Sequence, residues 1–165
     1  MKYIFKVLFF PFNFTYYKIK RVHLKAQLKK ISIQSVDSLN GYEFEKFVSN
    51  VFFAHGYHTA VTKKGADKGV DVVAKKRGKT LVVQTKMYYN HNVSNSAVQQ
   101  IYTAKKFYNA HLAIVVTNWY FTKHATELAD KLNVVLIDRS ELIEILNGKR
   151  LKFLLNIASY NDKKG

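Results

Sequence analysis

Apolar side chains recur at three- and four-residue steps downstream of Asn40, which is the spacing of one helix face. Asn40 can cap the first turn of this helix and Gly56 can end it. The apolar face comprises Phe44, Phe47, Val48, Val51 and Phe52. The pattern therefore predicts an amphipathic helix at the start of a folded domain.

Short apolar segments then alternate with segments of helical spacing. The expected strands are 57–61, 70–74, 80–86, 112–117 and 134–138, and the expected helices are 96–108, 122–132 and 140–146. Residues 112–117 form a continuous apolar run, as in a strand that is buried on both faces. Strands that alternate with helices indicate an α/β fold, in which helices flank a central mixed sheet on both faces.

The first 39 residues differ from the rest and are expected to form an N-terminal extension. Residues 3–17 are mostly aromatic and aliphatic, and a basic run follows at 18–30. The apolar stretch is shorter than the ~20 residues needed to span a bilayer. The segment could pack on the domain or a partner, or residues 1–30 could lie on an anionic membrane surface; the basic run could equally contact DNA. The expected organisation is thus an extension (1–39), a catalytic domain (40–147) and a tail (148–165).

The charge balance points to a polyanionic partner. Lys and Arg number 27 against 11 Asp and Glu, which gives a net charge of +16. DNA fits this charge, and an anionic membrane surface is the alternative. The sequence has no cysteine, which excludes disulfides, thiolate metal ligands and a cysteine nucleophile. We expect a cytoplasmic protein, with peripheral membrane association as an open alternative.

Acidic residues are scarce where the strands are expected. Between Lys46 and Thr126 the only carboxylates are Asp67 and Asp71. Asp67 lies in a glycine-rich segment, where aspartate is common in turns. Asp71 lies in an expected strand, so it is the better candidate for chemistry.

The hairpin formed by 70–74 and 80–86 predicts which side chains accompany Asp71. A turn at Arg77-Gly78 sets a register in which Asp71 faces Gln84, and directly paired residues project to the same face. Lys86 lies two residues beyond Gln84 and shares that face. The opposite face is expected to be core and comprises Val70, Val72, Leu81 and Val83.

An acid, an amide and an amine at one corner suit metal-dependent phosphodiester hydrolysis. Carboxylate and amide oxygens are ligands for Mg²⁺, which binds few protein groups and keeps waters. The lysine could orient the attacking water or stabilise the negative charge of the transition state. The non-catalytic alternative is a simple salt bridge between Asp71 and Lys86, with Gln84 exposed beside it.

The motifs around this corner resemble a known family. The segment GADKGVD (65–71), followed by VVQTK (82–86), resembles the Mrr-like restriction endonucleases of the PD-(D/E)xK nuclease superfamily, in the variant with glutamine before the lysine. The resemblance continues in order through 41–45, 56–57, 97–99, 115–118, 121–122 and 136–139. It implies a restriction-endonuclease-like fold and a metal-dependent endodeoxyribonuclease.

The resemblance also implies a role for each matching residue. Asp71 would be the principal metal ligand, Gln84 would take the usual place of a metal-binding acid, and Lys86 would be the catalytic lysine. Glu45 would supply a third metal ligand from the first helix, and Gln99 an auxiliary polar group facing the same cleft. The implied ion is Mg²⁺, with Mn²⁺ as a substitute, and cutting both DNA strands would call for a homodimer.

Two alternatives of other classes stay open. Glutamine is a neutral and weaker ligand than a carboxylate, so the chain could be a DNA-binding module that keeps the nuclease scaffold without its activity. It could also be a membrane-surface adaptor directed by residues 1–30, with the nuclease-like domain used for binding.

Overall fold

The computed structural model describes residues 4–62 and 69–151, with side chains described from residue 15. Asp67 and the segment 63–68 therefore lie outside the described residues. The helices are α1 (Ile4–Leu28), α2 (Ile33–Asp37), α3 (Gly41–Ala54), α4 (Asn95–Phe107), α5 (Lys123–Leu132) and α6 (Arg139–Leu146). The strands are β1 (His58–Val61), β2 (Val72–Lys76), β3 (Lys79–Lys86), β4 (Leu112–Thr117) and β5 (Val134–Ile137).

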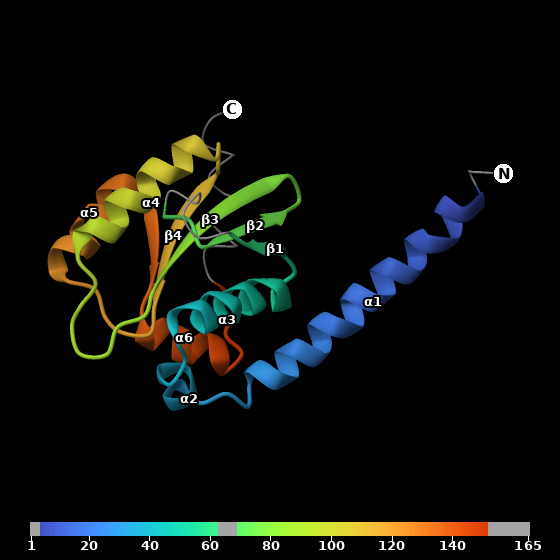
Figure 1. Ribbon diagram of the computed structural model, residues 1–165, viewed down its shortest axis with the longest axis horizontal. Helices are drawn as coiled ribbons and strands as arrows, with labels where there is room; N and C mark the ends of the chain where they lie inside the picture. Colours follow the sequence, from blue (N-terminus) through green and yellow to red (C-terminus); the bar gives the residue numbers. More distant parts are fainter. Residues whose placement is uncertain (1–3, 63–68, 152–165) are drawn as a thin grey trace.

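The strands form one mixed sheet in the order β1-β2-β3-β4-β5 (Figure 1). The β1-β2 and β2-β3 pairs are antiparallel, whereas β3-β4 and β4-β5 are parallel. Each parallel connection is made by a helix, α4 between β3 and β4 and α5 between β4 and β5. The β3 strand lies at the centre of the sheet, where neighbours on both sides hold it.

Helices cover both faces of the sheet, and each face has its own core. On one face, α3 and α6 bury a cluster that includes Phe44, Phe52, Leu81, Ile114 and Leu142. On the other, α4 and α5 bury a second cluster that includes Val82, Val98, Ile101, Val115 and Ala129. This confirms the predicted fold, an α/β restriction-endonuclease-like domain with a mixed sheet flanked by helices.

The first predicted helix begins at the residue that the sequence indicates. The Asn40 side chain accepts a hydrogen bond from the backbone N–H of Glu43, and the Glu43 carboxylate accepts one from the N–H of Asn40. This reciprocal capping box satisfies two backbone donors that the helix itself cannot satisfy. It fixes where α3 begins and hence where its apolar face meets the sheet.

The predicted hairpin register is confirmed along β2 and β3. Val72 pairs with Val83, and Lys76 pairs with Lys79. Arg77 and Gly78 have φ values of 48° and 74°, as a two-residue turn of the favoured hairpin hand requires.

The start of β2 differs from the prediction, because the regular strand begins at Val72 instead of Val70. The Asp71 N–H donates to the carbonyl of Val83, one residue away from the partner that a regular ladder would supply. Val70 consequently packs in the second core, whereas Val72 packs in the first. The expectation that Val70 and Val72 share a face is therefore wrong.

The C-terminal end of the N-terminal extension packs into the core of the domain. Leu28 of α1 and Val36 of α2 are buried in the first core, 6% and 1% exposed. Leu151, just before the undescribed residues 152–165, is buried in the same core. The packed domain therefore extends beyond 40–147 on both sides.

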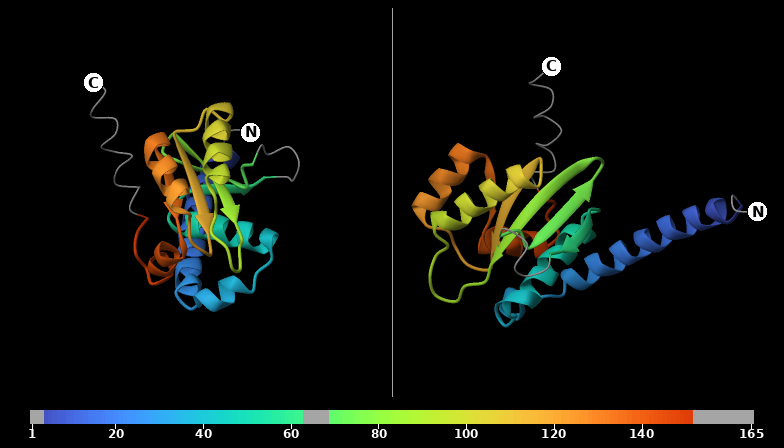
Figure 2. Two further views of the ribbon diagram at one scale, coloured as in Figure 1. Left: turned by 90° about the vertical axis from the view of Figure 1, so that its left-hand side faces the viewer. Right: turned by 45° about the horizontal axis from the view of Figure 1, so that its top comes forward.

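The N-terminal part of α1 projects away from the sheet, as Figure 1 and the right-hand view of Figure 2 show. Of the helices in the described chain, none combines the length and the apolar character that crossing a membrane would need.

Candidate active site

The Asp71 carboxylate is held against the end of β3. Its Oδ2 accepts hydrogen bonds from the backbone N–H of Thr85 at 2.6 Å and from the Thr85 hydroxyl at 3.0 Å. Thr85 is the residue between Gln84 and Lys86. The Asp71 carbonyl accepts from the Thr62 N–H at 2.9 Å, so strand-like bonds hold Asp71 on both sides. The carboxylate is thereby fixed beside the QTK segment although it lies outside the regular strand.

Gln84 is buried, with 3% exposure, on the face of the sheet that α4 covers. Its Nε2 donates to Oε1 of Gln100 on α4 at 2.9 Å, which fixes the orientation of the amide. In the described part of the chain, Gln84 Oε1 is a buried acceptor without a hydrogen-bond partner. A buried polar atom of this kind is costly by about 1–3 kcal/mol unless a ligand or ion satisfies it.

Lys86 is the last residue of β3 and pairs with Thr117 at the end of β4. It is half-buried, and strand alternation puts it on the same face as Gln84. Among the salt bridges of residues 15–62 and 69–151, none joins Lys86 to Asp71. The simple ion pair that was the non-catalytic alternative is therefore not formed.

Glu45 lies on α3 at the level of Asp71. The Ser49 hydroxyl donates to the Thr59 hydroxyl at 2.9 Å, which aligns α3 with β1. Glu45 is one helical turn before Ser49, about 6 Å along the axis, and Val61 lies about 7 Å beyond Thr59 along the strand. Val61 pairs with Val72, the neighbour of Asp71. Because α3 covers the face opposite to α4, half-buried Glu45 lies on the other side of the sheet from Gln84.

Gln99 lies on the exposed side of α4, and the contact with Gln84 is made by its neighbour Gln100. The buried positions of α4 are Ala97, Val98, Ile101 and Ala104. At 100° per residue, this stripe puts Gln99 opposite the buried face and Gln100 at its border. The phase of the helix therefore favours Gln100 over Gln99 for the contact with Gln84, a signal that the sequence already contains, and the role of Gln99 stays a prediction.

Gly69 closes over the Gln84 amide. A Cβ atom at this position would lie 3.1 Å from Gln84 Nε2 and 3.8 Å from Cβ of Gln100. Gly69 also has φ of 82°, in the left-handed region that favours glycine. Glycine is therefore favoured here both by the backbone conformation and by the close approach to the amide.

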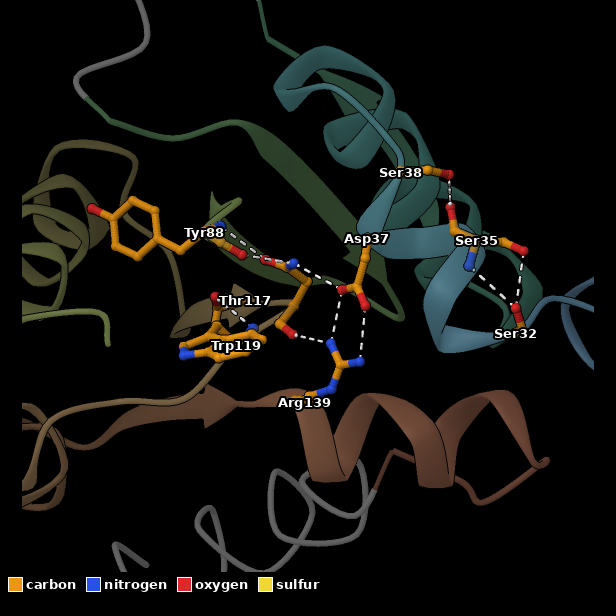
Figure 3. Close-up of polar contacts among 9 residues, drawn as sticks. Ser32, Ser35, Asp37, Ser38, Tyr88, Thr117, Trp119 and Arg139 are labelled. Atoms are coloured by element: carbon orange, nitrogen blue, oxygen red, sulfur yellow. Dashed lines mark hydrogen bonds and ion pairs between the residues drawn. The ribbon is translucent and has the colours of Figure 1, made fainter. Parts of the chain in front are cut away.

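A second polar network, which sequence reasoning missed, holds the chain just after Lys86 (Figure 3). The buried Asn118 side chain accepts from the Tyr88 N–H and donates to the Tyr88 carbonyl, both at 2.9 Å. Its amide nitrogen also donates to Asp37 Oδ1 at 3.0 Å. Asn118 thereby ties the exit of β3 to the exit of β4 and to α2.

Arg139 completes this network from the start of α6. Its two terminal nitrogens donate to the two oxygens of Asp37 at 2.7 and 2.8 Å, and one also donates to the Asn118 carbonyl. The hydrogen bonds from Arg139 and Asn118 lower the pKa of Asp37 below its ordinary value, and the Asp37 carboxylate raises the pKa of Arg139. Asp37 had been placed in the extension, yet it anchors the loops beside the candidate site.

The residues at this corner fit a divalent ion that keeps most of its waters. In residues 15–62 and 69–151, no three His, Cys, Asp or Glu side chains gather into a metal cluster. The donors available here are the Asp71 carboxylate and the buried amide oxygen of Gln84, with Glu45 across the sheet. One or two protein oxygens per ion is the pattern of Mg²⁺ sites, and the unpartnered Gln84 oxygen is a suitable ligand.

The mixed sheet and this corner define a restriction-endonuclease-like protein. The family model Mrr_cat, described as a restriction endonuclease, matches residues 36–146, and the chain belongs to this family. The match begins at Val36, in agreement with the packing of α2 into the domain. No protein with curated annotation matches the chain.

Solved structures share the fold at low sequence identity. A protein of unknown function, AF1548, is similar with a TM-score of 0.57 and 21% identity over 65% of each chain. The modification-dependent restriction endonuclease AspBHI is similar with a TM-score of 0.54 and 14% identity, over 87% of this chain and 39% of that one. MspJI, solved with a 27-mer oligonucleotide, has a TM-score of 0.51 and 19% identity, over 81% and 35%. The chain therefore spans 65% or less of these proteins.

Proposed function

We propose that the chain is an Mg²⁺-dependent endodeoxyribonuclease, in which Mn²⁺ can replace Mg²⁺. Two observations carry the proposal: the buried, unpartnered Oε1 of Gln84, and an Asp71 carboxylate that is fixed to the next residue of β3, Thr85. Membership of a restriction endonuclease family supports it. The substrate would be a DNA phosphodiester bond, which water would hydrolyse.

Each residue of the corner has a distinct part in this proposal. Asp71 and Gln84 would hold the ion, which would polarise a phosphoryl oxygen and acidify a bound water. Glu45, which lies across the sheet from Gln84, would reach the same ion through its bound waters. Lys86 would orient the attacking water or stabilise the negative charge that develops on the phosphate. Gln100 would keep the Gln84 oxygen turned away from α4, because it accepts from the amide nitrogen. Gln99, which lies on the exposed side of α4, is assigned no contact with the reacting atoms.

The proposed partner is duplex DNA. The net charge of +16 supplies phosphate affinity that does not depend on sequence. MspJI, a structural relative, was solved with an oligonucleotide. We also propose a homodimer, because cutting both strands calls for two active sites, and a cytoplasmic location.

The deciding experiment is incubation of the full chain with supercoiled plasmid in Mg²⁺, in Mn²⁺ and in chelator. The expected result is nicked or linear DNA with either ion and intact plasmid with chelator. A DNA-binding module without activity would instead bind in a salt-sensitive way and leave the plasmid intact under all three conditions. That outcome would refute the proposed function while leaving the fold assignment untouched.

A further inference from the structure

The helix α1 leaves the domain at the end of the sheet that is remote from Asp71. The Tyr17 ring contacts Phe53 and His58, with centroids 6.2 and 5.9 Å apart, and His58 pairs with Lys75 near the β2-β3 turn. Asp71 lies about 15 Å from this turn along the strand. Upstream of Tyr17, α1 extends beyond the other elements (Figures 1 and 2).

The projecting helix exposes large apolar side chains. Of the nine large hydrophobic residues that are exposed in the described chain, four lie between positions 16 and 22. Tyr16, Ile19 and Val22 are 56%, 64% and 65% exposed. Upstream, the sequence is apolar at most positions from 3 to 14. An exposed apolar surface of this kind needs an apolar partner.

The same segment carries only positive charge. Residues 1–36 contain no Asp or Glu, and their eight cations are Lys2, Lys6, Lys18, Lys20, Arg21, Lys25, Lys29 and Lys30. Lys18 and Lys20 are exposed and lie among the exposed apolar residues. Aromatic and aliphatic residues interleaved with lysine are typical of helices that lie in the interface of an anionic membrane.

Further cations gather where α1 crosses the domain. Lys76 donates to the His55 carbonyl at 2.8 Å, and its pKa is lowered by burial and by the positive charges of Arg77, Arg21 and Lys25. Arg21 Nε is a buried donor without a partner among the described residues. An anionic surface would offset the electrostatic repulsion among these positive charges at one end of the domain.

We propose that α1 lies on an anionic phospholipid bilayer, with its aromatic and aliphatic residues in the interface and its lysines on the lipid phosphates. This inference is independent of the proposed nuclease activity. It gives the domain an attachment to the membrane while the corner with Asp71 and Lys86 remains at the far end of the sheet.

Two other occupants fit the observations less well. Duplex DNA would pair with the lysines, but it offers no partner to exposed Ile19 and Val22. A second copy of the chain would bring another basic segment and a further net charge of +16 to the contact. Of these three occupants, the anionic bilayer satisfies both the charge and the apolar surface.

The test is flotation of the full chain with vesicles, measured with and without about 30% phosphatidylserine in phosphatidylcholine. We expect flotation only with the anionic vesicles, and loss of it in about 0.5 M salt, where the Debye length is only a few ångströms. Lys18→Glu with Lys20→Glu should lower the partition coefficient at least about twentyfold, since each basic residue near an anionic surface contributes about fivefold.

The matched control is Lys106→Glu with Lys131→Glu, which makes the same charge change at exposed positions on α4 and α5. It should float nearly as well as the parent chain. The proposal is overturned if the parent chain does not float with anionic vesicles, or if both double variants lose flotation equally. It is also overturned if the α1 variant loses only DNA affinity or self-association.

Discussion

The Asp71 carboxylate receives a 2.6 Å hydrogen bond from the backbone N–H of Thr85, the residue between Gln84 and Lys86. The carboxylate is thereby held against the QTK segment by a backbone donor, which a substitution at Thr85 would not remove. We therefore expect the segment around Asp71 and the end of β3 to stay together when a single side chain such as that of Lys86 is replaced.

Lys86→Ala should abolish DNA cleavage while the domain stays folded. Lys86 forms no salt bridge with Asp71, so its removal leaves no buried charge unpaired, and the expected cost in stability is below about 1 kcal/mol. The measurement is plasmid cleavage alongside thermal unfolding. Lys79→Ala, at the other end of β3, is the matched control and should cut normally. Equal cleavage by the two variants would contradict the assigned role.

Gln84→Glu should strengthen the effect of metal on stability. A carboxylate at the buried position 84 costs free energy without metal, because burial disfavours its charged form, and it adds an anionic ligand when metal is present. A tenfold gain in affinity contributes about 1.4 kcal/mol, or roughly 3–6 °C in the melting temperature of a chain this size.

This variant is read by comparing melting temperatures in Mn²⁺ and in chelator. Gln99→Glu makes the same charge change on the exposed side of α4 and should leave the metal effect at the parental value. If the two glutamate variants respond to Mn²⁺ alike, Gln84 is not a ligand.

The hairpin and the first helix could be predicted in detail, because local signals decide them. The turn at Arg77-Gly78 sets the register of β2 and β3, and Asn40 caps α3. The position of Val70 could not be predicted by alternation, since Gly69 at φ of 82° interrupts the extended backbone just before it.

Long-range contacts account for what the sequence did not indicate. Asp37 and Arg139 are separated by 102 positions, and no periodicity connects them. The contact between Gln100 and Gln84 is different, since the buried stripe of α4 could have identified Gln100 as the residue that borders the core. Sequence patterns thus predicted the principal candidates Asp71, Gln84 and Lys86, whose roles remain to be tested, but not the polar groups that support them.

Gly69→Ala should destabilise the domain more than Gly78→Ala. Both glycines have positive φ, which costs an alanine about 1–2 kcal/mol. At Gly78 an added Cβ meets nothing within 4 Å, whereas at Gly69 it meets the Gln84 amide at 3.1 Å. Urea unfolding of the two variants isolates the contact from the backbone effect. Equal losses in the free energy of unfolding would mean that the Gln84 amide moves aside from the added Cβ without a cost in stability.

A chain restricted to residues 40–147 should be markedly less stable than one covering 28–151. The shorter chain lacks Leu28, Val36 and Leu151, each buried in the first core and each worth about 1.5–3 kcal/mol. It also leaves Arg139 without Asp37. Denaturant unfolding of the two chains is the measurement, and equal midpoints would restore the boundary at residue 40.

Asp37→Asn should weaken the domain at neutral pH and much less in acid. Because Arg139 lowers the pKa of Asp37 in the folded state, the ionised carboxylate adds stability above the unfolded pKa of about 3.9 and loses it as the pH falls through the folded value. Loss of the charged pair should cost about 2 kcal/mol at pH 7, with the partial exposure of both side chains limiting the effect.

The variant is measured by urea unfolding at pH 7 and near pH 3 beside Asp130→Asn, an exposed carboxylate on α5. The Asp130 variant should stay close to the parent chain at both pH values, whereas the deficit of the Asp37 variant should shrink in acid. Since Asn118 joins Asp37 to the Tyr88 backbone, the Asp37 variant should also loosen the segment after Lys86, measurable as faster amide exchange at Tyr88. A loss of stability in the Asp37 variant that is the same at both pH values would show that packing, and not the charge of Asp37, stabilises this network.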